Sequence, residues 1–240
     1  RFRQVISLCM AGSYPSTLLN ALPPEARPRE KMLAKGPAAL ADSELLALIL
    51  RTGLAGKNVL SLAAELLHSH GGLRGLLNTP PAQLQAIKGL GAAKLCQLQA
   101  VLELTRRALA EELREKPALQ SPQAVRQFLQ LHLQHKTHEV FCVLFLKTQH
   151  QLSACEEMFR GTIDSAQVYP REIAARALQL GARSMILAHN HPSGQAQPSM
   201  ADKQLTQRIR DALALLDIQL LDHIIIAGAN SYSMAEQGDC

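Results

Sequence analysis

The sequence predicts an all-α module followed by a domain of the mixed α/β class. Apolar residues recur at helical spacing from about residue 29 to residue 116, the pattern of amphipathic helices. Beyond residue 122, apolar runs of strand length alternate with helical stretches. The segment KPALQSP separates the two patterns. We therefore expect a helical module at 29–116, a linker at 117–121 and an α/β domain at 122–240.

The composition is typical of a folded protein. The 240 residues are 47% hydrophobic and 19% charged, which is enough to bury a core and excludes a disordered chain. No stretch approaches the ~20 apolar residues that span a bilayer, so no membrane partner is expected. The 5 cysteines are odd in number and form no Cys-x-x-Cys pair. This pattern argues against a disulfide framework and favours a cytoplasmic location.

The chain is expected to begin with an arm and then to form short helices. Residues 1–28 are rich in proline, alanine and serine, and they predict an extended arm without its own core. Apolar residues at helical spacing follow Asp42 and again follow Asn58, and both residue types cap helices. Pairs such as Gly71-Gly72 interrupt the pattern. This punctuation predicts a bundle with short loops.

Two glycines between apolar helices predict an anion site in the helical module. Gly89 and Gly91 flank a leucine, and glycine lets a backbone approach a ligand closely. A helix that begins near Gly91 would direct its free N–H groups toward this turn, where Lys88 and Lys94 add positive charge. DNA or RNA phosphate would satisfy such a site. The simpler interpretation is a helical hairpin, closed by glycine, that binds nothing.

The charge distribution favours a polyanion partner for the first part of the chain. Residues 1–136 contain 17 Lys+Arg and 9 Asp+Glu, a balance of +8, whereas residues 137–240 contain 8 and 11, a balance of −3. This asymmetry is typical of a polyanion-binding module joined to another domain, although solvated helix faces also produce it. Aromatic residues are only 3% of the chain, which argues against base stacking on single strands.

The second part is expected to contain a mixed sheet. Its first helix begins at Pro122, with Ser121 as the cap. The later runs predict strands at 140–146, 151–159, 185–188 and 220–227, and helices at 171–180 and 200–216.

The strongest functional signal is a predicted metal site of two histidines and one carboxylate. His189 and His191 follow directly after a predicted strand, and residues i and i+2 of an extended segment point the same way. A turn-rich loop returns the chain to Ser199, a predicted helix cap that directs Asp202 back toward the loop. Three such ligands suit one Zn²⁺ per chain and leave a fourth position for water, as in catalytic sites.

A structural interpretation of the same residues is also open. His189 and His191 could be satisfied loop histidines, and Ser199 with Asp202 could form only a capping box worth about 1 kcal/mol. The combination of a strand, the two histidines before a proline, a turn-rich loop and Ser-x-x-Asp is much harder to reach by chance. We therefore favour the metal site.

The combination resembles the His-x-His-Pro and Ser-x-x-Asp signature of the JAMM (MPN-plus) metalloproteases, and more closely the bacterial RadC family, whose members are named as DNA-repair proteins. The glycine turn resembles the helix-hairpin-helix motif of DNA-repair proteins. The resemblance extends from about Pro28 to Gly238. The segments that carry it are 28–31, 44–48, the glycine turn, 161–163, 169–173, 186–202 and 221–223.

The resemblance implies an MPN/JAB-like (cytidine-deaminase-like) sheet flanked by helices, after a helix-hairpin-helix module. It implies a zinc site made by His189, His191 and Asp202. It also implies a glutamate, at the place of Glu139, that hydrogen-bonds to the water on the metal and acts as a base. Glu156, Glu157 and Glu172 are the rival carboxylates.

The resemblance also assigns a role to Ser199, and the apolar residues after His223 indicate one for that histidine. Ser199 would donate a hydrogen bond to an oxyanion, although it could equally be a helix cap. His223 is expected to be a partner of the site or a core histidine rather than a ligand.

The leading hypothesis is a zinc metallohydrolase that cleaves a peptide or isopeptide bond in a protein or peptide substrate. The alternative is a non-catalytic DNA-repair or recombination protein that binds DNA or acts as an adaptor. The two are compatible, because one module could deliver the other to proteins bound to DNA. A metal-dependent nuclease is the weakest reading, since two-metal chemistry usually needs more clustered carboxylates.

Overall fold

The computed structural model of the protein describes residues 23–133, 136–161 and 168–240. The chain divides into two compact units, Arg1–Val101 and Leu102–Cys240. The division falls inside helix α7 (Ala92–Glu115) and therefore lies before the linker expected at 117–121. Residues 92–115 contain neither glycine nor proline, so nothing in the sequence breaks this helix before Pro117.

The segment expected to be a linker belongs to the second unit. It contains a short 3-10 helix, η4 (Ala118–Gln120). Ala118 is buried in the core of this unit, and its N–H donates to the carbonyl oxygen of His150 at 2.8 Å. A proline among small and polar residues is typical of a linker. The same composition also occurs in a tight turn that packs on a domain.

The first unit is built from short helices, as predicted. Of the expected arm, residues 1–22 lie outside the described residues, and Pro28 begins a helix and is buried. Asn58 caps α4, its side chain accepting from the Ser61 N–H at 2.8 Å. The helices and 3-10 helices that precede α7 are η2 (Pro24–Ala26), α2 (Pro28–Lys35), η3 (Pro37–Ala39), α3 (Asp42–Leu50), α4 (Val59–Ser69), α5 (Leu73–Asn78) and α6 (Pro81–Gln85).

A leucine-rich core holds these helices together. Leucines from α3, α4, α5, α6 and the start of α7 form one buried cluster, which includes Leu46, Leu66, Leu76, Leu84 and Leu98. Leu90, between the two glycines of the predicted hairpin, is fully buried in the same cluster. The hairpin is therefore anchored by its central leucine.

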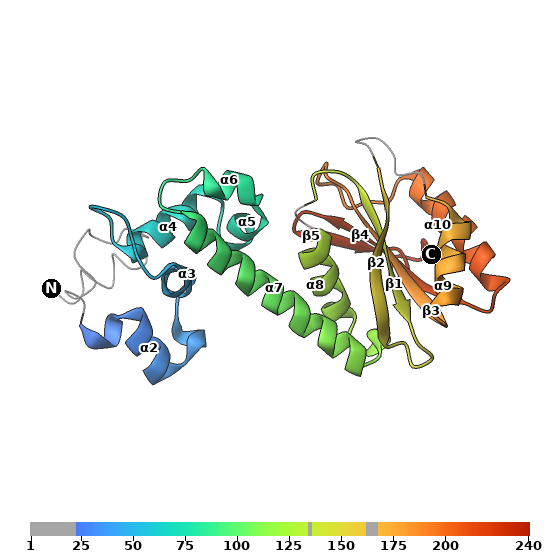
Figure 1. The fold of residues 1–240 in the computed structure, drawn as a ribbon, viewed down its shortest axis with the longest axis horizontal. Helices are drawn as coiled ribbons and strands as arrows, with labels where there is room; N and C mark the ends of the chain where they lie inside the picture. Colours follow the sequence, from blue (N-terminus) through green and yellow to red (C-terminus); the bar gives the residue numbers. More distant parts are fainter. Residues whose placement is uncertain (1–22, 134–135, 162–167) are drawn as a thin grey trace. The chain divides into compact units, whose positions relative to one another are not determined.

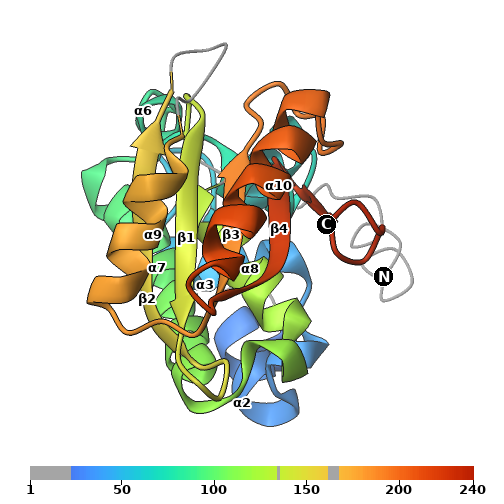
Figure 2. The same ribbon diagram turned by 90° about the vertical axis from the view of Figure 1, so that its right-hand side faces the viewer.

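The second unit is a five-stranded mixed sheet with the strand order β2-β1-β3-β4-β5. Figure 2 shows the first four strands side by side in that order. β3 and β4 are parallel, and the other neighbouring pairs are antiparallel. The short polar β5 was not predicted, because it lacks the apolar alternation of a strand. The strands are β1 (Val140–Leu146), β2 (Leu152–Arg160), β3 (Ser184–Asn190), β4 (Gln219–Ala227) and β5 (Asn230–Ser233).

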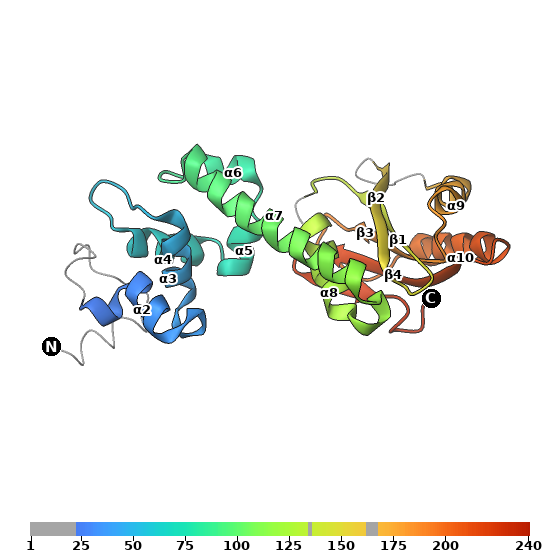
Figure 3. The same cartoon turned by 60° about the horizontal axis from the view of Figure 1, so that its bottom comes forward.

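Helices cover both faces of this sheet, which confirms the predicted α/β class. Helix α8 (Pro122–Leu133) packs on one face, against alternate residues of β1 such as Cys142 and Leu144. Helices α9 (Pro170–Gln179) and α10 (Met200–Ala214) pack on the other face, against Phe141 and Val143. Figures 1 and 3 show α8 on the side of the sheet opposite to α9 and α10. Both faces are buried, so β1 is apolar throughout and β3 is apolar from Met185 to Ala188.

Two smaller observations concern the whole described chain. None of its helices is both long and apolar enough to cross a membrane. The four cysteines outside the undescribed segments, Cys96, Cys142, Cys155 and Cys240, are free thiols.

Candidate metal centre

The two histidines lie where β3 ends beside the beginning of β1. His189 is in β3, and its partner in the antiparallel register is Phe141 of β1. Continuing this register by two residues puts Glu139 opposite His191. The N–H of His191 donates to the Ile226 carbonyl oxygen of β4 at 2.8 Å, which holds the first residue after β3 against the sheet. The β1–β3 register therefore brings Glu139 and the two histidines together at one end of these strands.

The third predicted ligand comes from the first turn of α10. Ser199 caps this helix, since its Oγ accepts from the Asp202 N–H at 3.1 Å. The carboxylate of Asp202 reaches back, and its Oδ2 accepts from the Ser199 N–H at 2.7 Å and from the Ser199 hydroxyl at 2.6 Å. The capping box was predicted, and it fixes the orientation of the carboxylate. The helix cap and the metal-ligand interpretation are therefore compatible.

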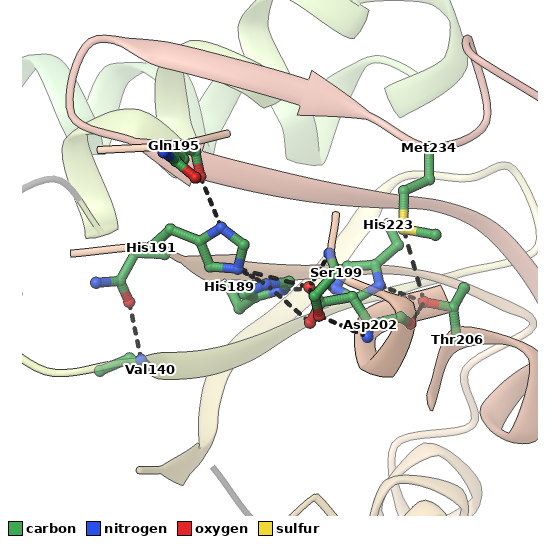
Figure 4. A network of polar contacts seen from close by, with 10 residues as sticks. Val140, His189, His191, Gln195, Ser199, Asp202, Thr206, His223 and Met234 are labelled. Carbon is green, nitrogen blue, oxygen red and sulfur yellow. Dashed lines mark hydrogen bonds and ion pairs between the residues drawn. The ribbon is translucent and has the colours of Figure 1, made fainter. Parts of the chain in front are cut away.

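Four side chains converge in this region. One potential ligand atom from each of Glu139, His189, His191 and Asp202 lies within 4.8 Å of the others. The Nε2 atoms of the two histidines are 2.9 Å apart. Asp202 Oδ1 lies 3.3 Å from Nε2 of His189, and Asp202 Oδ2 lies 3.6 Å from Nε2 of His191. Figure 4 shows both imidazoles directed toward Asp202.

The proton positions of this cluster fit a cation. Nδ1 of His191 lies 2.7 Å from the Gln195 carbonyl oxygen, which can only accept, so Nδ1 donates its proton there. Nδ1 of His189 likewise faces away from the cluster, toward His223 at 2.8 Å. A proton on Nδ1 of His189 would leave two Nε2 lone pairs and a carboxylate facing one another, and these groups repel unless a positive charge lies between them. Two neutral imidazoles and a carboxylate are a donor set that suits Zn²⁺.

The electrostatics of the cluster favour a neutral His189 and an ionised Asp202, the forms that bind a cation. Burial lowers the pKa of His189 to about 4, so this imidazole is neutral near pH 7. Burial alone would raise the pKa of Asp202, but hydrogen bonds from His191 and Ser199 hold it well below its usual value. Hydrogen bonding to Asp202 raises the pKa of His191. Asp202 is therefore ionised, and a proton on His191 competes with a metal.

Glu139 differs from Asp202 in its electrostatic environment. Partial burial raises its pKa above the ordinary value of a glutamate, and the neighbouring Asp202 raises it further, while His191 opposes the shift. A carboxyl group with a raised pKa is a better proton acceptor than an ordinary one. The structure thus places a carboxyl group with a raised pKa beside the three predicted ligands.

The rival carboxylates are engaged elsewhere. Glu156 accepts two hydrogen bonds from Arg176 of α9, at 2.6 and 2.8 Å. Glu157 accepts from Lys136 at 2.6 Å and from Arg160 at 3.0 Å. Glu172 contacts Arg171. Among the described carboxylates, the cluster contains Glu139 and Asp202 only.

Sequence reasoning missed the role of Asn190, the residue between the two histidines. Because residues of a strand alternate between faces, Asn190 points away from His189. Its Oδ1 accepts from the Val140 N–H at 2.8 Å. Its Nδ2 donates to the His138 carbonyl oxygen at 3.1 Å and to that of Lys136 at 3.3 Å. One amide thus holds the segment that carries Glu139 on both sides, and only the strand register could have indicated this.

His223 lies behind His189, as a partner rather than as one of the clustered ligands. It is fully buried in β4, and its Nδ1 lies 2.6 Å from the hydroxyl of Thr206 in α10. Phe141 stacks parallel to His189, with ring centroids 6.1 Å apart, and packs edge-on against His223. These contacts fix the plane of the His189 ring. Thr206 and Phe141 were not singled out, because neither residue type carries a metal signal in the sequence.

The glycine hairpin differs from the predicted anion site at two positions. Gly89 has a φ of +100°, and a Cβ added there would lie 2.9 Å from both methyl carbons of Leu54, so Gly89 packs against a side chain. The Lys94 ammonium donates to the Thr52 carbonyl oxygen at 2.6 Å and, at 3.4 Å, to that of Gly53. Lys88 and Gly91 are exposed. Lys94 therefore closes the hairpin onto a neighbouring loop.

Comparison with known proteins agrees with this architecture. Residues 119–239 match the model of the RadC-like JAB domain, and residues 19–96 match that of the UPF0758 N-terminal family. A UPF0758 protein from Polaromonas sp. (strain JS666) is 59% identical over 221 residues, which cover 92% of this chain and 99% of that protein. A UPF0758 protein from Delftia acidovorans is 61% identical over 222 residues, which cover 92% and 98%.

Proposed function

This chain belongs to the RadC family of UPF0758 proteins, which carry a RadC-like JAB domain, and we propose that it is a zinc-dependent hydrolase that cleaves a peptide or isopeptide bond. The observation that carries the proposal is the approach of the Glu139 carboxylate to the donor atoms of His189, His191 and Asp202, all within 4.8 Å. A site that served only to hold a structural metal would use all four protein donors and leave no base.

Each residue of the cluster has a distinct task in this proposal. His189, His191 and Asp202 would hold the cation, with both Nδ1 atoms directed outward. When bound, the cation would supply Lewis-acid activation of a water molecule and of a substrate carbonyl. Glu139 accepts a proton as the water oxygen bonds to the carbonyl carbon. It returns that proton to the amine nitrogen as the C–N bond breaks.

Ser199 has two tasks in the proposal. Its hydroxyl orients Asp202 through the contact of 2.6 Å. We also assign it the hydrogen bond that stabilises the oxyanion of the reacting carbonyl, a role that typically contributes about 10²–10³ in rate. This second task requires the hydroxyl proton to turn away from Asp202.

Metal content and cleavage test the proposal together. The full chain is loaded with Zn²⁺, its metal content is measured, and it is incubated with peptides joined by α-amide bonds or by lysine isopeptide bonds. We expect one zinc ion per chain and cleavage, both of which are lost in His189→Ala. His68→Ala, which removes an exposed histidine of α4, is the matched control and should change neither. A wild-type chain without zinc, or cleavage that survives in His189→Ala, contradicts the proposal.

A second function, contact with DNA phosphate through the helical unit, is supported by the exposed Lys88 and Gly91 at the beginning of α7. Open space surrounds Gly91, where an added Cβ would contact nothing within 4 Å. Gly91 directly precedes this 24-residue helix, and the first N–H groups of a helix favour anions.

Salt titrations of duplex and branched DNA test this second function. Lys88→Gln should reduce the slope of log affinity against log salt by about 1, because it removes one phosphate contact. Lys94→Gln should leave that slope unchanged, since backbone carbonyls already bind its ammonium. Equal slopes for the wild type and Lys88→Gln, or no binding at low salt, contradict a phosphate contact at this turn.

A further inference from the structure

An unbroken chain of hydrogen-bonding groups runs inward from His189. Nδ1 of His189 lies 2.8 Å from Nε2 of His223, and Nδ1 of His223 lies 2.6 Å from Oγ1 of Thr206. Oγ1 of Thr206 lies 2.6 Å from the backbone carbonyl oxygen of Asp202. His189, His223 and Thr206 are 1%, 0% and 1% exposed, so their hydrogen bonds are closed to bulk water. Figure 4 shows the inner part of the chain, from His223 to Thr206.

One arrangement of protons satisfies all these contacts. The Asp202 carbonyl oxygen can only accept, so the Thr206 hydroxyl donates its single proton there. Oγ1 of Thr206 is then an acceptor for the Nδ1–H of His223. Among the described residues, the hydroxyl has one further recorded contact, with the weakly accepting sulfur of Met234 at 3.7 Å.

The same arrangement determines the proton on His189. Neutral His223 with its proton on Nδ1 has a lone pair on Nε2, which accepts the Nδ1–H of His189. Nε2 of His189 is left without a proton, on the side that faces Asp202 Oδ1 at 3.3 Å. A histidine binds a cation through such an unprotonated nitrogen.

We propose that His223 and Thr206 are positioning residues, which hold His189 in the neutral tautomer that binds a cation through Nε2. The inference rests on the metal site of the proposed function but not on the reaction. We call the hydrogen-bonded series His189–His223–Thr206 the relay. Thr206 ends it, because its hydroxyl donates to the backbone carbonyl oxygen of Asp202, the residue that also supplies the carboxylate. The α10 turn from Asp202 to Thr206 therefore carries the Asp202 carboxylate itself. It also orients His189 through the side chains of Thr206 and His223.

Loss of the Thr206 hydroxyl should reverse the direction of the hydrogen bond between His189 and His223. Without the hydroxyl, the Nδ1–H of His223 loses its acceptor, and a buried donor without a partner is unfavourable. Moving that proton to Nε2 removes the unpaired donor and makes His223 donate to Nδ1 of His189. The proton of His189 then moves to Nε2, where it points at Asp202 and obstructs a metal.

Paired substitutions in the full chain test the relay. Thr206→Val removes the hydroxyl and nearly preserves shape, while Thr206→Ser keeps the hydroxyl and removes the methyl group. His223→Leu removes the acceptor for His189, while His223→Gln can keep an oxygen in reach of Nδ1. Zn²⁺ affinity is measured by competition with a chelator, and the ring tautomers of the metal-free proteins are read from two-bond ¹H–¹⁵N correlations of ¹⁵N-labelled histidine.

We expect the metal-free wild type to carry the protons of His189 and His223 on Nδ1. Thr206→Val should move the His189 proton to Nε2 and weaken Zn²⁺ binding about 10- to 100-fold, the usual effect of removing a partner of a metal ligand. Thr206→Ser should keep the His189 proton on Nδ1 and the Zn²⁺ affinity of the wild type. The Thr206 pair keeps the test decisive if His223→Leu does not fold.

Three results would overturn the relay: a wild-type His189 proton on Nε2, equal Zn²⁺ affinity in Thr206→Val and wild type, or a Thr206→Ser variant that behaves like Thr206→Val. A wild type that binds Zn²⁺ but cleaves no peptide contradicts the proposed hydrolase alone. A chain that follows the expected tautomer and affinity pattern supports the relay whatever its hydrolytic activity.

Discussion

The side-chain oxygen of Asn190 accepts a hydrogen bond from the Val140 N–H at 2.8 Å, so the residue between the two histidines is joined to the residue after Glu139. The amide nitrogen of Asn190 adds donations to the carbonyl oxygens of Lys136 and His138. The histidines and the proposed base are thus mutually fixed by one buried side chain on the far face of β3.

Asn190→Ala should destabilise the second unit by about 1–3 kcal/mol, because buried backbone groups of the 136–140 segment lose their partner. Chemical denaturation measures this loss, and hydrogen exchange of the Val140 amide should become faster. Asn190→Asp is the matched control, since it keeps the acceptor for Val140 but donates to neither carbonyl. An unchanged exchange rate at Val140 in Asn190→Ala would show that this contact contributes nothing.

Glu139→Gln should retain Zn²⁺ and lose cleavage. The amide cannot accept a proton, and removing a general base costs about 10²–10⁴ in rate. Metal content and initial rates on a cleaved peptide are measured together. Glu172→Gln, which changes an exposed carboxylate of α9, should alter neither. Loss of zinc in Glu139→Gln would instead identify Glu139 as a fourth ligand.

Substitutions at Ser199 separate its role as a helix cap from its proposed contact with the oxyanion. Ser199→Ala should lower the free energy of unfolding by about 1 kcal/mol through loss of the helix cap. Ser199→Asn restores an N-cap side chain but not the hydroxyl. If the hydroxyl stabilises the oxyanion, cleavage by both variants should fall about 10²–10³-fold. Full activity in Ser199→Asn would show that Ser199 serves only as a helix cap and does not stabilise the oxyanion.

The two glycines of the hairpin should respond differently to alanine. Gly89→Ala forces a side chain into a positive-φ conformation and against Leu54, so we expect a loss of about 1–3 kcal/mol in the stability of the first unit. Gly91→Ala meets open space, and it should change stability by less than about 1 kcal/mol. Denaturant titration of both variants measures the difference. Equal effects would contradict the packing of Leu54 on Gly89.

The ion pair that joins Glu156 of β2 to Arg176 of α9 should make stability depend on pH. Hydrogen bonds from Arg176 lower the pKa of Glu156 in the folded protein, so folding favours the ionised form. The contribution is therefore present above the ordinary glutamate pKa of about 4.3 and disappears as the pH falls through the folded pKa. The pair is partly exposed, so its contribution is small.

The matched variant for this pair is Glu156→Gln. Its unfolding free energy should be lower than that of the wild type at pH 7, and the difference should shrink as the pH is lowered to 3. Urea unfolding of both proteins at the two pH values measures it. A difference that grows as the pH falls has the wrong sign and would contradict the ion pair.

The features that sequence reasoning identified are encoded locally. The strand that carries His189 follows from its apolar run, and the Ser199 cap with Asp202 follows from a spacing of three residues. The order of a helical unit before an α/β sheet follows from the change of apolar period. In each case the residues concerned are neighbours in sequence, so chain geometry alone relates them.

Tertiary structure decided what depends on residues distant in sequence. Glu139 rather than Glu156, Glu157 or Glu172 joins the cluster because the β1–β3 register aligns Phe141 with His189. Lys94 faces Thr52 because a loop 42 residues earlier packs on the hairpin. His223 reaches His189 only because β4 lies parallel beside β3. Strand order, register and loop packing set these contacts, and a residue type by itself does not specify its partner across a sheet.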